Sequence, residues 1–225
     1  MEITWYGSAC VRLRGKEGIV VADAFPSVVG PTGRGLTADI ATYSHREPVV
    51  AANGRSNGHR AAGEEGVPTS LVPAFRLDGP GEYEVHDVLV TGVRTARDEA
   101  KGTERGLNTA FVVQLDGLHA IHLGDLGHAL TEEQLREIGS VDLACVPIGG
   151  HLSAAKAAEV VAQLEVNLVV PLLVAETEEA AESALARFLH EMGAKDLTPQ
   201  PKLTVTVSSV PPEMTVALLE SRARV

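Results

Sequence analysis

Aromatic residues are scarce in this sequence, at 4% of its 225 residues. Proteins that bind single-stranded nucleic acids usually offer aromatic side chains on which the bases stack. Basic residues are also outnumbered, with 19 Lys and Arg against 30 Asp and Glu, which gives a net charge of −11. A field of this sign repels phosphate polymers and anionic membranes. The composition therefore predicts neither a nucleic-acid partner nor a membrane partner.

Long hydrophobic runs are missing as well. The longest apolar stretch, residues 167–175, is far shorter than the roughly 20 residues needed to span a bilayer. The N-terminus carries Glu2 and lacks the apolar core of a signal peptide. The two cysteines, Cys10 and Cys145, lie in apolar runs without metal-ligand spacing, so we expect buried free thiols in a reducing compartment. These absences predict a cytoplasmic protein.

Aliphatic residues are plentiful, since hydrophobic residues make up 44% of the chain, and their order indicates the fold. Short strand patterns dominate up to about residue 123, and strands then alternate with helical patterns. We predict an α/β fold, a sandwich of two sheets flanked by helices, in a single domain over 1–225. The detailed expectations are hairpin turns at His86-Asp87 and Asp116-Gly117, helices after Thr131 and Ser153 and over 176–192, strands over 70–75, 203–208 and 215–220, and a loop over 26–37.

Polar residues follow two of the predicted strands, at 42–47 and 122–128. In α/β proteins such strand ends gather functional groups. Asp125 lies between Gly124 and Gly127 at the end of an apolar strand. A carboxylate in this position either binds a cation or caps a turn. The sequence alone leaves both readings of Asp125 open.

These stretches resemble the metallo-β-lactamase superfamily, in particular its branch of ascorbate-phosphate lactonase-like metal-dependent hydrolases. The resemblance runs in order through most of the chain, from residue 1 to about 220. It implies a metallo-β-lactamase-like αββα sandwich, with two mixed sheets flanked by helices. It rests on Cys10, on Asp23 and on the segments ITWYG at 3–7, DGPGEYE at 78–84, ERGLNT at 104–109, HLGDLGH at 122–128 and VPIGG at 146–150.

The resemblance implies a two-metal site, but few of its ligands are present. In the expected H-x-H-x-D-H motif His45 matches the first histidine and Glu47 stands for the second, while valines stand at the last two ligand positions. A further histidine is replaced by Arg97, and the bridging carboxylate is Asp125. The final histidine falls on Leu173. Aliphatic side chains offer no lone pair, so at most one weak zinc or manganese ion is expected, on His45, Glu47 and Asp125.

From this ligand count we predict a degenerate, non-catalytic binding or interaction protein, a pseudoenzyme without a cofactor. Glu47 and Asp125 without a metal would be uncompensated carboxylates, so we hypothesise that the Arg97 guanidinium fills the former metal site. The alternative is a hydrolase of small esters or lactones, phosphorylated or not, with a single ion on the same three residues. Asp125 would then be the catalytic residue.

A small anion is a third candidate ligand, and its binding residues would be basic side chains near the predicted site. Arg46, together with Arg94, Arg97, Lys101 and Arg105 of the 94–106 segment, could converge on a carboxylate or phosphate. The alternative is a solvated loop whose cations pair with its own Asp98, Glu99 and Glu104.

The remaining histidines offer weaker signals. His128 and His151 follow glycines near the predicted site and either bind an anion or a metal or are plain loop residues. His122, on an apolar strand, is expected in the core. The partner stays open between a small anion and another protein, and assembly of identical subunits stays open too.

Overall fold

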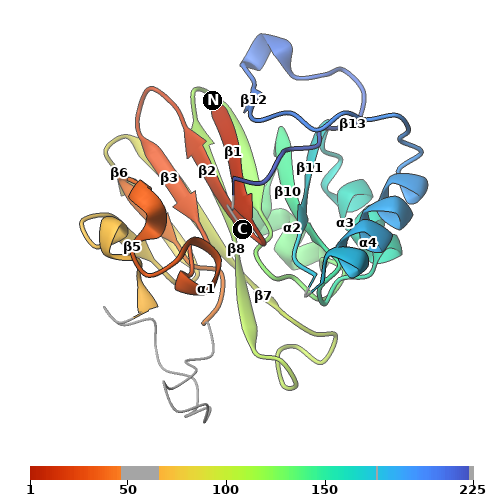
Figure 1. Cartoon of the computed structure of the whole chain (residues 1–225), viewed down its shortest axis with the longest axis horizontal. Coiled ribbons are helices and arrows are strands. Elements are labelled where there is room, and N and C mark those ends of the chain that lie inside the picture. The colour runs from red at the N-terminus through yellow and green to blue at the C-terminus, as the bar shows by residue number, and fades with distance from the viewer. Residues whose placement is uncertain (47–65, 176, 223–225) are drawn as a thin grey trace.

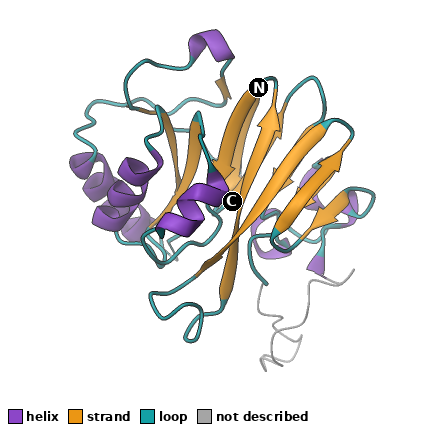
Figure 2. Cartoon of the chain, turned by 180° about the vertical axis from the view of Figure 1, so that it is seen from behind, coloured by secondary structure: helices purple, strands orange, loops and turns teal. Residues whose placement is uncertain are grey.

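The computed structural model describes residues 1–46, 66–175 and 177–222, and these fold into two β-sheets that pack face to face (Figure 1). The prediction of an αββα sandwich with two mixed sheets is confirmed. Helices α2, α3 and α4 cover the outer face of one sheet, as the view from behind also shows (Figure 2). The much shorter α1 lies beside the other sheet.

The first sheet has the strand order β12-β1-β2-β3-β4-β5. Strands β1 to β3 run antiparallel, with Ile3 opposite Leu13, and β3, β4 and β5 run parallel. The bounds are β1 Glu2–Gly7, β2 Cys10–Arg14, β3 Ile19–Ala22, β4 Ile40–Thr42, β5 Phe75–Leu77 and β12 Leu203–Thr204.

The second sheet has the order β13-β11-β10-β9-β8-β7-β6. Strands β6 to β9 run antiparallel, and β9, β10, β11 and β13 run parallel. Helix α2 is the crossover from β9 to β10, and α3 is the crossover from β10 to β11. The bounds are β6 Gly81–Val85, β7 Val88–Ala96, β8 Leu107–Leu115, β9 Leu118–His122, β10 Leu143–Ile148, β11 Leu168–Leu173 and β13 Thr215–Val216, with helices α1 Pro26–Val29, α2 Glu132–Ile138, α3 Ala154–Leu164 and α4 Glu178–Glu191.

Two apolar clusters hold these layers together. One fills the space between the sheets and includes Ile3, Phe111 and Val170. The other lies between the second sheet and its helices and includes Ile121 and Phe188. Strand β10 is buried at every position because it is covered on both faces, which explains its unbroken apolar sequence. Both cysteines are free and buried, as expected.

Local sequence signals place the turns and the helix starts as predicted. His86, Asp87, Asp116 and Gly117 all have positive φ, the conformation that a two-residue type I′ hairpin turn requires. Helices α2, α3 and α4 begin at side-chain caps. Thr131 forms a capping box with Gln134, while Ser153 and Thr177 each accept a backbone N–H three residues on.

Several strand predictions were wrong. A strand over 70–75 is replaced by a 3-10 turn over Thr69–Leu71, and β5 begins only after Pro73, which has no N–H to donate to a ladder. The strand over 203–208 ends after two residues because Thr206 caps a 3-10 turn with Ser209. The strand expected over 215–220 is likewise only two residues long. The 26–37 loop contains α1 and another 3-10 turn.

Three features of this architecture prepare the site. Strands β3, β4 and β9 end at the same edge of the two-sheet stack, and the long β7–β8 connection extends there, drawn yellow-green at the lower edge of Figure 1. The second residue after β4 is linked directly to the other sheet, since the Thr109 N–H donates to the Ser44 carbonyl at 2.7 Å. Among the described residues, none of the helices has the length and apolarity to cross a membrane.

Candidate functional site

His45 follows β4, and its ring is oriented by a chain of hydrogen bonds. Asp23, at the end of β3, is buried and accepts both the N–H of Ser44, at 2.7 Å, and the Ser44 hydroxyl, at 2.5 Å. A carboxylate only accepts, so the single hydroxyl hydrogen of Ser44 is used on Asp23. The Ser44 oxygen must then accept from Nδ1 of His45, 2.9 Å away. His45 therefore carries its proton on Nδ1 and keeps the lone pair of Nε2 free.

The surroundings of His45 keep the imidazole neutral. Burial lowers the pKa of His45 below its ordinary value of 6.5, although the charges of Asp23 and Asp125 act in the opposite direction. The ring packs against Phe25, with 4.9 Å between ring centroids. His45 and Asp125 line one small cavity of about 140 Å³. A neutral imidazole and a carboxylate, from different sheets, thus face a common space.

Asp125 is held in place by close backbone packing after β9. Its N–H donates to the side-chain oxygen of Asn108, at 2.9 Å, and Asn108 in turn donates to the carbonyl of Leu123. Gly124 has a φ of +64°, and a Cβ there would overlap Ser44. A Cβ at Gly127 would overlap the backbone of Arg97. The two glycines of this segment are required because the chain passes so close to the rest of the site.

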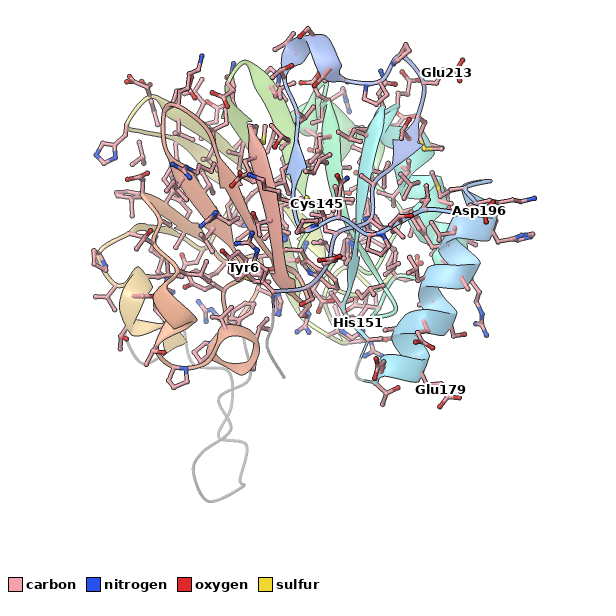
Figure 3. The ribbon with its side chains drawn as sticks, turned by 45° about the horizontal axis from the view of Figure 1, so that its top comes forward. Tyr6, Cys145, His151, Glu179, Asp196 and Glu213 are labelled. Atoms are coloured by element: carbon pink, nitrogen blue, oxygen red, sulfur yellow. The ribbon has the colours of Figure 1, made fainter. Side chains whose placement is uncertain are left out.

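Arg97 points its guanidinium at Asp125. Its Nε and Nη2 both lie 2.7 Å from Oδ2 of Asp125, and the two side chains are only 17% and 14% exposed. His151, labelled in Figure 3, comes from the loop between β10 and α3, and its Nε2 lies 3.4 Å from the same oxygen and 3.4 Å from Nη2 of Arg97. Arg97 also donates to the carbonyl of Arg105, at 3.2 Å. One oxygen of the carboxylate therefore accepts from the guanidinium, and the imidazole of His151 lies beside this pair.

The described residues do not by themselves fit a hydrolytic metal ion. A catalytic zinc needs three protein ligands and an open position. The part of the chain that the structure describes contains no group of three His, Cys, Asp or Glu side chains able to hold an ion. His45 and Asp125 have suitable donor atoms, but Arg97 competes for Asp125. Glu47, the third predicted ligand, lies outside the described residues.

The loop between β7 and β8 is fastened by Asp98. Its carboxylate accepts the N–H groups of Gly102 at 2.8 Å, Glu104 at 3.2 Å and Arg105 at 2.6 Å. Burial acts to raise the pKa of Asp98, but these hydrogen bonds outweigh it and lower the pKa below its ordinary value of 3.8. The loop that carries Arg97 and Arg105 is thereby held in a fixed conformation.

A larger cleft of about 500 Å³ opens beside His45, and four arginines line it. Arg46 follows His45, Arg94 lies on β7, and Arg97 and Arg105 come from the β7–β8 loop. Of the predicted basic residues, Lys101 alone does not line this cleft. The four arginines therefore line one cleft, and whether they bind an anion there stays a prediction.

The other predicted site histidines have structural surroundings. Both ring nitrogens of His128 have backbone partners, since Nε2 accepts the Ala96 N–H at 3.0 Å and Nδ1 lies 2.6 Å from the Ala129 carbonyl. His122 is buried beneath the site, with Nε2 2.7 Å from the carbonyl of Ala9. His128 thus joins β7 to the segment after β9 and lies apart from the cavity of His45 and Asp125.

Sequence reasoning missed several residues that build the site. The sequence does not single out Ser44, and Asn108 stands out only within the 104–109 segment, although both orient the central side chains. His151 was one of several loop histidines, and its place beside Asp125 depends on the β10–α3 loop. The one available signal was the pairing of polar residues with glycines at strand ends.

Comparison with known proteins identifies relatives for nearly the whole chain. Residues 2–173 match the family model described as the Beta-lactamase superfamily domain. A protein of Methanoculleus marisnigri named a metal-dependent hydrolase is 27% identical over 181 residues, which cover 76% of this chain and 80% of that protein. A Methanoregula boonei protein with the same description is 28% identical and covers 76% and 81%.

A solved structure from Thermotoga maritima agrees with these relatives. It is described as a candidate Zn-dependent hydrolase of the metallo-β-lactamase superfamily, and it superposes with a TM-score of 0.71 at 27% identity. The match covers 98% of this chain and 99% of that one. Both the fold and the relatives therefore point to hydrolases.

These relatives overturn the prediction of a non-catalytic binding or interaction protein. That prediction was wrong, because proteins similar over three quarters of the chain are named metal-dependent hydrolases. The ligand count compared residue types at aligned positions only. Such a count does not see side chains that reach the site from another loop, such as His151 beside Asp125.

Proposed function

Because the chain belongs to the metallo-β-lactamase superfamily, we propose that it is a metal-dependent hydrolase of a small ester or lactone. One observation carries the proposal. The hydrogen-bond chain from Asp23 through Ser44 leaves the Nε2 lone pair of His45 free, in the cavity that Asp125 also lines. A metal-binding imidazole needs this arrangement, in which one ring nitrogen is held by a hydrogen bond and the other keeps its lone pair for the ion.

We assign the donors of a single metal ion as His45, Asp125 and Glu47. Glu47 is included on sequence grounds, because it stands two residues after His45 in the segment that resembles the family's ligand motif. Imidazole and carboxylate ligands suit zinc, and a set with more oxygen donors suits manganese. In this assignment Arg97 and the metal ion compete for the carboxylate of Asp125. We therefore expect the native chain to bind the ion weakly.

The cleft beside His45 gives the substrate its place. Its volume of about 500 Å³ suits a small molecule rather than a polymer. His45 lines both the cleft and the smaller cavity, so a substrate in the cleft would reach the reacting groups directly. In the reaction, water adds to the carbonyl carbon and the carbon–oxygen bond to the alcohol breaks, which leaves a carboxylic acid.

The test combines metal analysis with a hydrolysis assay. The purified chain is analysed for metals before and after equilibration with zinc and with manganese, and each sample is assayed on a panel of small esters and lactones. We expect a metal-dependent activity that is lost in Asp125→Ala and His45→Ala. Glu182→Ala, which removes an exposed carboxylate from α4, is the matched control and should keep it.

Two results would count against the proposal. Hydrolysis that persists unchanged in Asp125→Ala would place the reaction elsewhere on the protein. Absence of bound metal together with absence of activity on the whole panel would remove the hydrolase assignment.

A further inference from the structure

We propose that Arg46, Arg94 and Arg105 form an anion subsite in the cleft beside His45, which binds a phosphate or carboxylate group. The inference deepens the proposed function and rests on it in one respect, namely that the anion is part of the hydrolysed substrate. Guanidinium groups are planar forks of donors that match both oxyanions, so the two share one recognition chemistry.

The first argument is that the acidic residues of the β7–β8 loop do not neutralise its arginines. Asp98 is used by backbone N–H groups of its own loop. Glu99 forms an ion pair with Lys156 of α3. Within the described part of the chain, neither Arg94 nor Arg105 forms an ion pair with any carboxylate. The expectation of an internally paired, solvated loop therefore does not describe these two side chains.

The second argument concerns the carboxylates at the cleft. Asp78 lines it but pairs with Arg76 at 2.7 Å, and Asp125 pairs with Arg97 at the same distance. The arginine charges that remain thus face the cleft without a counterion from the described residues. The chain as a whole has a net charge of −11, so a local surplus of cations runs against its general charge. Such a surplus is what recognition of a small anion requires.

The third argument is that the subsite is held ready. The N–H of Arg105 is bound to Asp98 at 2.6 Å and its carbonyl accepts from Arg97. Arg94 lies on β7, opposite Thr109 of β8 in the antiparallel ladder. Because these backbones are already fixed, binding an anion orders only side chains, which lowers its entropic cost. The same cleft includes His45, so an anion held here places the rest of the molecule beside the reacting groups.

The test measures anion binding directly and needs no turnover. The full chain is titrated calorimetrically at low ionic strength with inorganic phosphate and, in a separate series, with acetate; sodium chloride is the ionic-strength control. The test variant is Arg94→Gln/Arg105→Gln. The matched control is Arg14→Gln/Arg187→Gln, which removes the same charge from exposed positions on β2 and α4. The metal content of every sample is measured.

We expect saturable binding of at least one anion, weakened about tenfold or more in the cleft variant because charge-assisted hydrogen bonds are lost, and changed little in the control. Tighter binding of phosphate would identify a phosphorylated substrate, and tighter binding of acetate a carboxylated one. No saturable binding of either anion, or an equal loss in both double variants, would overturn the subsite. If the chain hydrolyses esters but binds neither anion, the proposed function stands and the anion subsite is refuted. If it binds an anion but hydrolyses no ester, the subsite stands and the proposed function is refuted.

Discussion

The pairing of Arg97 with Asp125 makes a quantitative prediction for Arg97→Gln. At a separation of about 4 Å between charge centres and an effective dielectric constant near 20, the attraction is worth about 4 kcal/mol before the desolvation cost is subtracted. Both side chains retain some contact with water, and His151 stands near the same oxygen. We therefore expect the variant to lose about 2 kcal/mol of the free energy of unfolding without metal, since it leaves a carboxylate uncompensated.

The same substitution should strengthen metal binding. Removing the guanidinium frees Oδ2 of Asp125 and removes a positive charge that opposes a cation. An ion that binds only the folded state then adds RT ln(1 + [L]/Kd) to the stability. Zinc should consequently restore stability to Arg97→Gln and have a much smaller effect on the native chain.

Urea unfolding followed by the fluorescence of Trp5, the single tryptophan and a buried one, measures both effects. Arg94→Gln is the control, because it removes a charge from the same cleft without touching Asp125. Equal unfolding free energies for the two variants, or a zinc response no larger than that of the native chain, would refute the reasoning about this pair.

Three further predictions concern the supports of the site. Asp98→Asn removes a carboxylate whose pKa is lowered in the folded state. In the native chain, the stability that this carboxylate contributes should be lost as the pH falls below about 3.8 towards the folded-state pKa. The variant should lack this loss, which unfolding measured at a series of pH values would show. Gly127→Ala should destabilise by about 2 kcal/mol or more because its Cβ overlaps the backbone of Arg97, while Gly79→Ala, with open space around it, should stay near the native unfolding free energy. Ser44→Ala should release the tautomer of His45, and nitrogen NMR of the imidazole should change from protonated Nδ1 to a mixture.

Each of these has a result that contradicts it. Parallel loss of stability in acid for the native chain and Asp98→Asn would mean that this carboxylate does not fasten the loop. A tolerated Gly127→Ala would mean that the two backbones separate at little cost. An unchanged imidazole spectrum in Ser44→Ala would place the control of the tautomer elsewhere.

Local signals were sufficient for much of the fold. Asp116-Gly117 specifies a turn by its own backbone preferences, and Thr131 with Gln134 specifies a helix start. Strand edges were harder: the strand expected over 70–75 begins only at Phe75, after Pro73, because its start depends on pairing with β4, which is distant in the sequence. Alternation of apolar residues identifies burial, but it does not tell where a ladder begins.

The site was only partly predictable for a related reason. His45, Arg97 and Asp125 could be named because each lies in a recognisable stretch of sequence. Their geometry could not, because Arg97 reaches Asp125 only through a loop shape that Asp98 sets by bonding backbone groups. A carboxylate that bonds backbone N–H groups has the same appearance in a sequence as one that pairs with a neighbouring arginine.

His45 and Asp125 come from different sheets, and this division has a consequence for how the protein tolerates change. The separation of the pair is set by the apolar layer between the sheets and by the Thr109–Ser44 backbone bond that crosses it. A substitution deep in that layer, at Phe111 for example, is expected to alter the spacing of His45 and Asp125 without touching either. The activity proposed for this chain should therefore be sensitive to changes in side-chain volume at buried positions that a substrate does not contact.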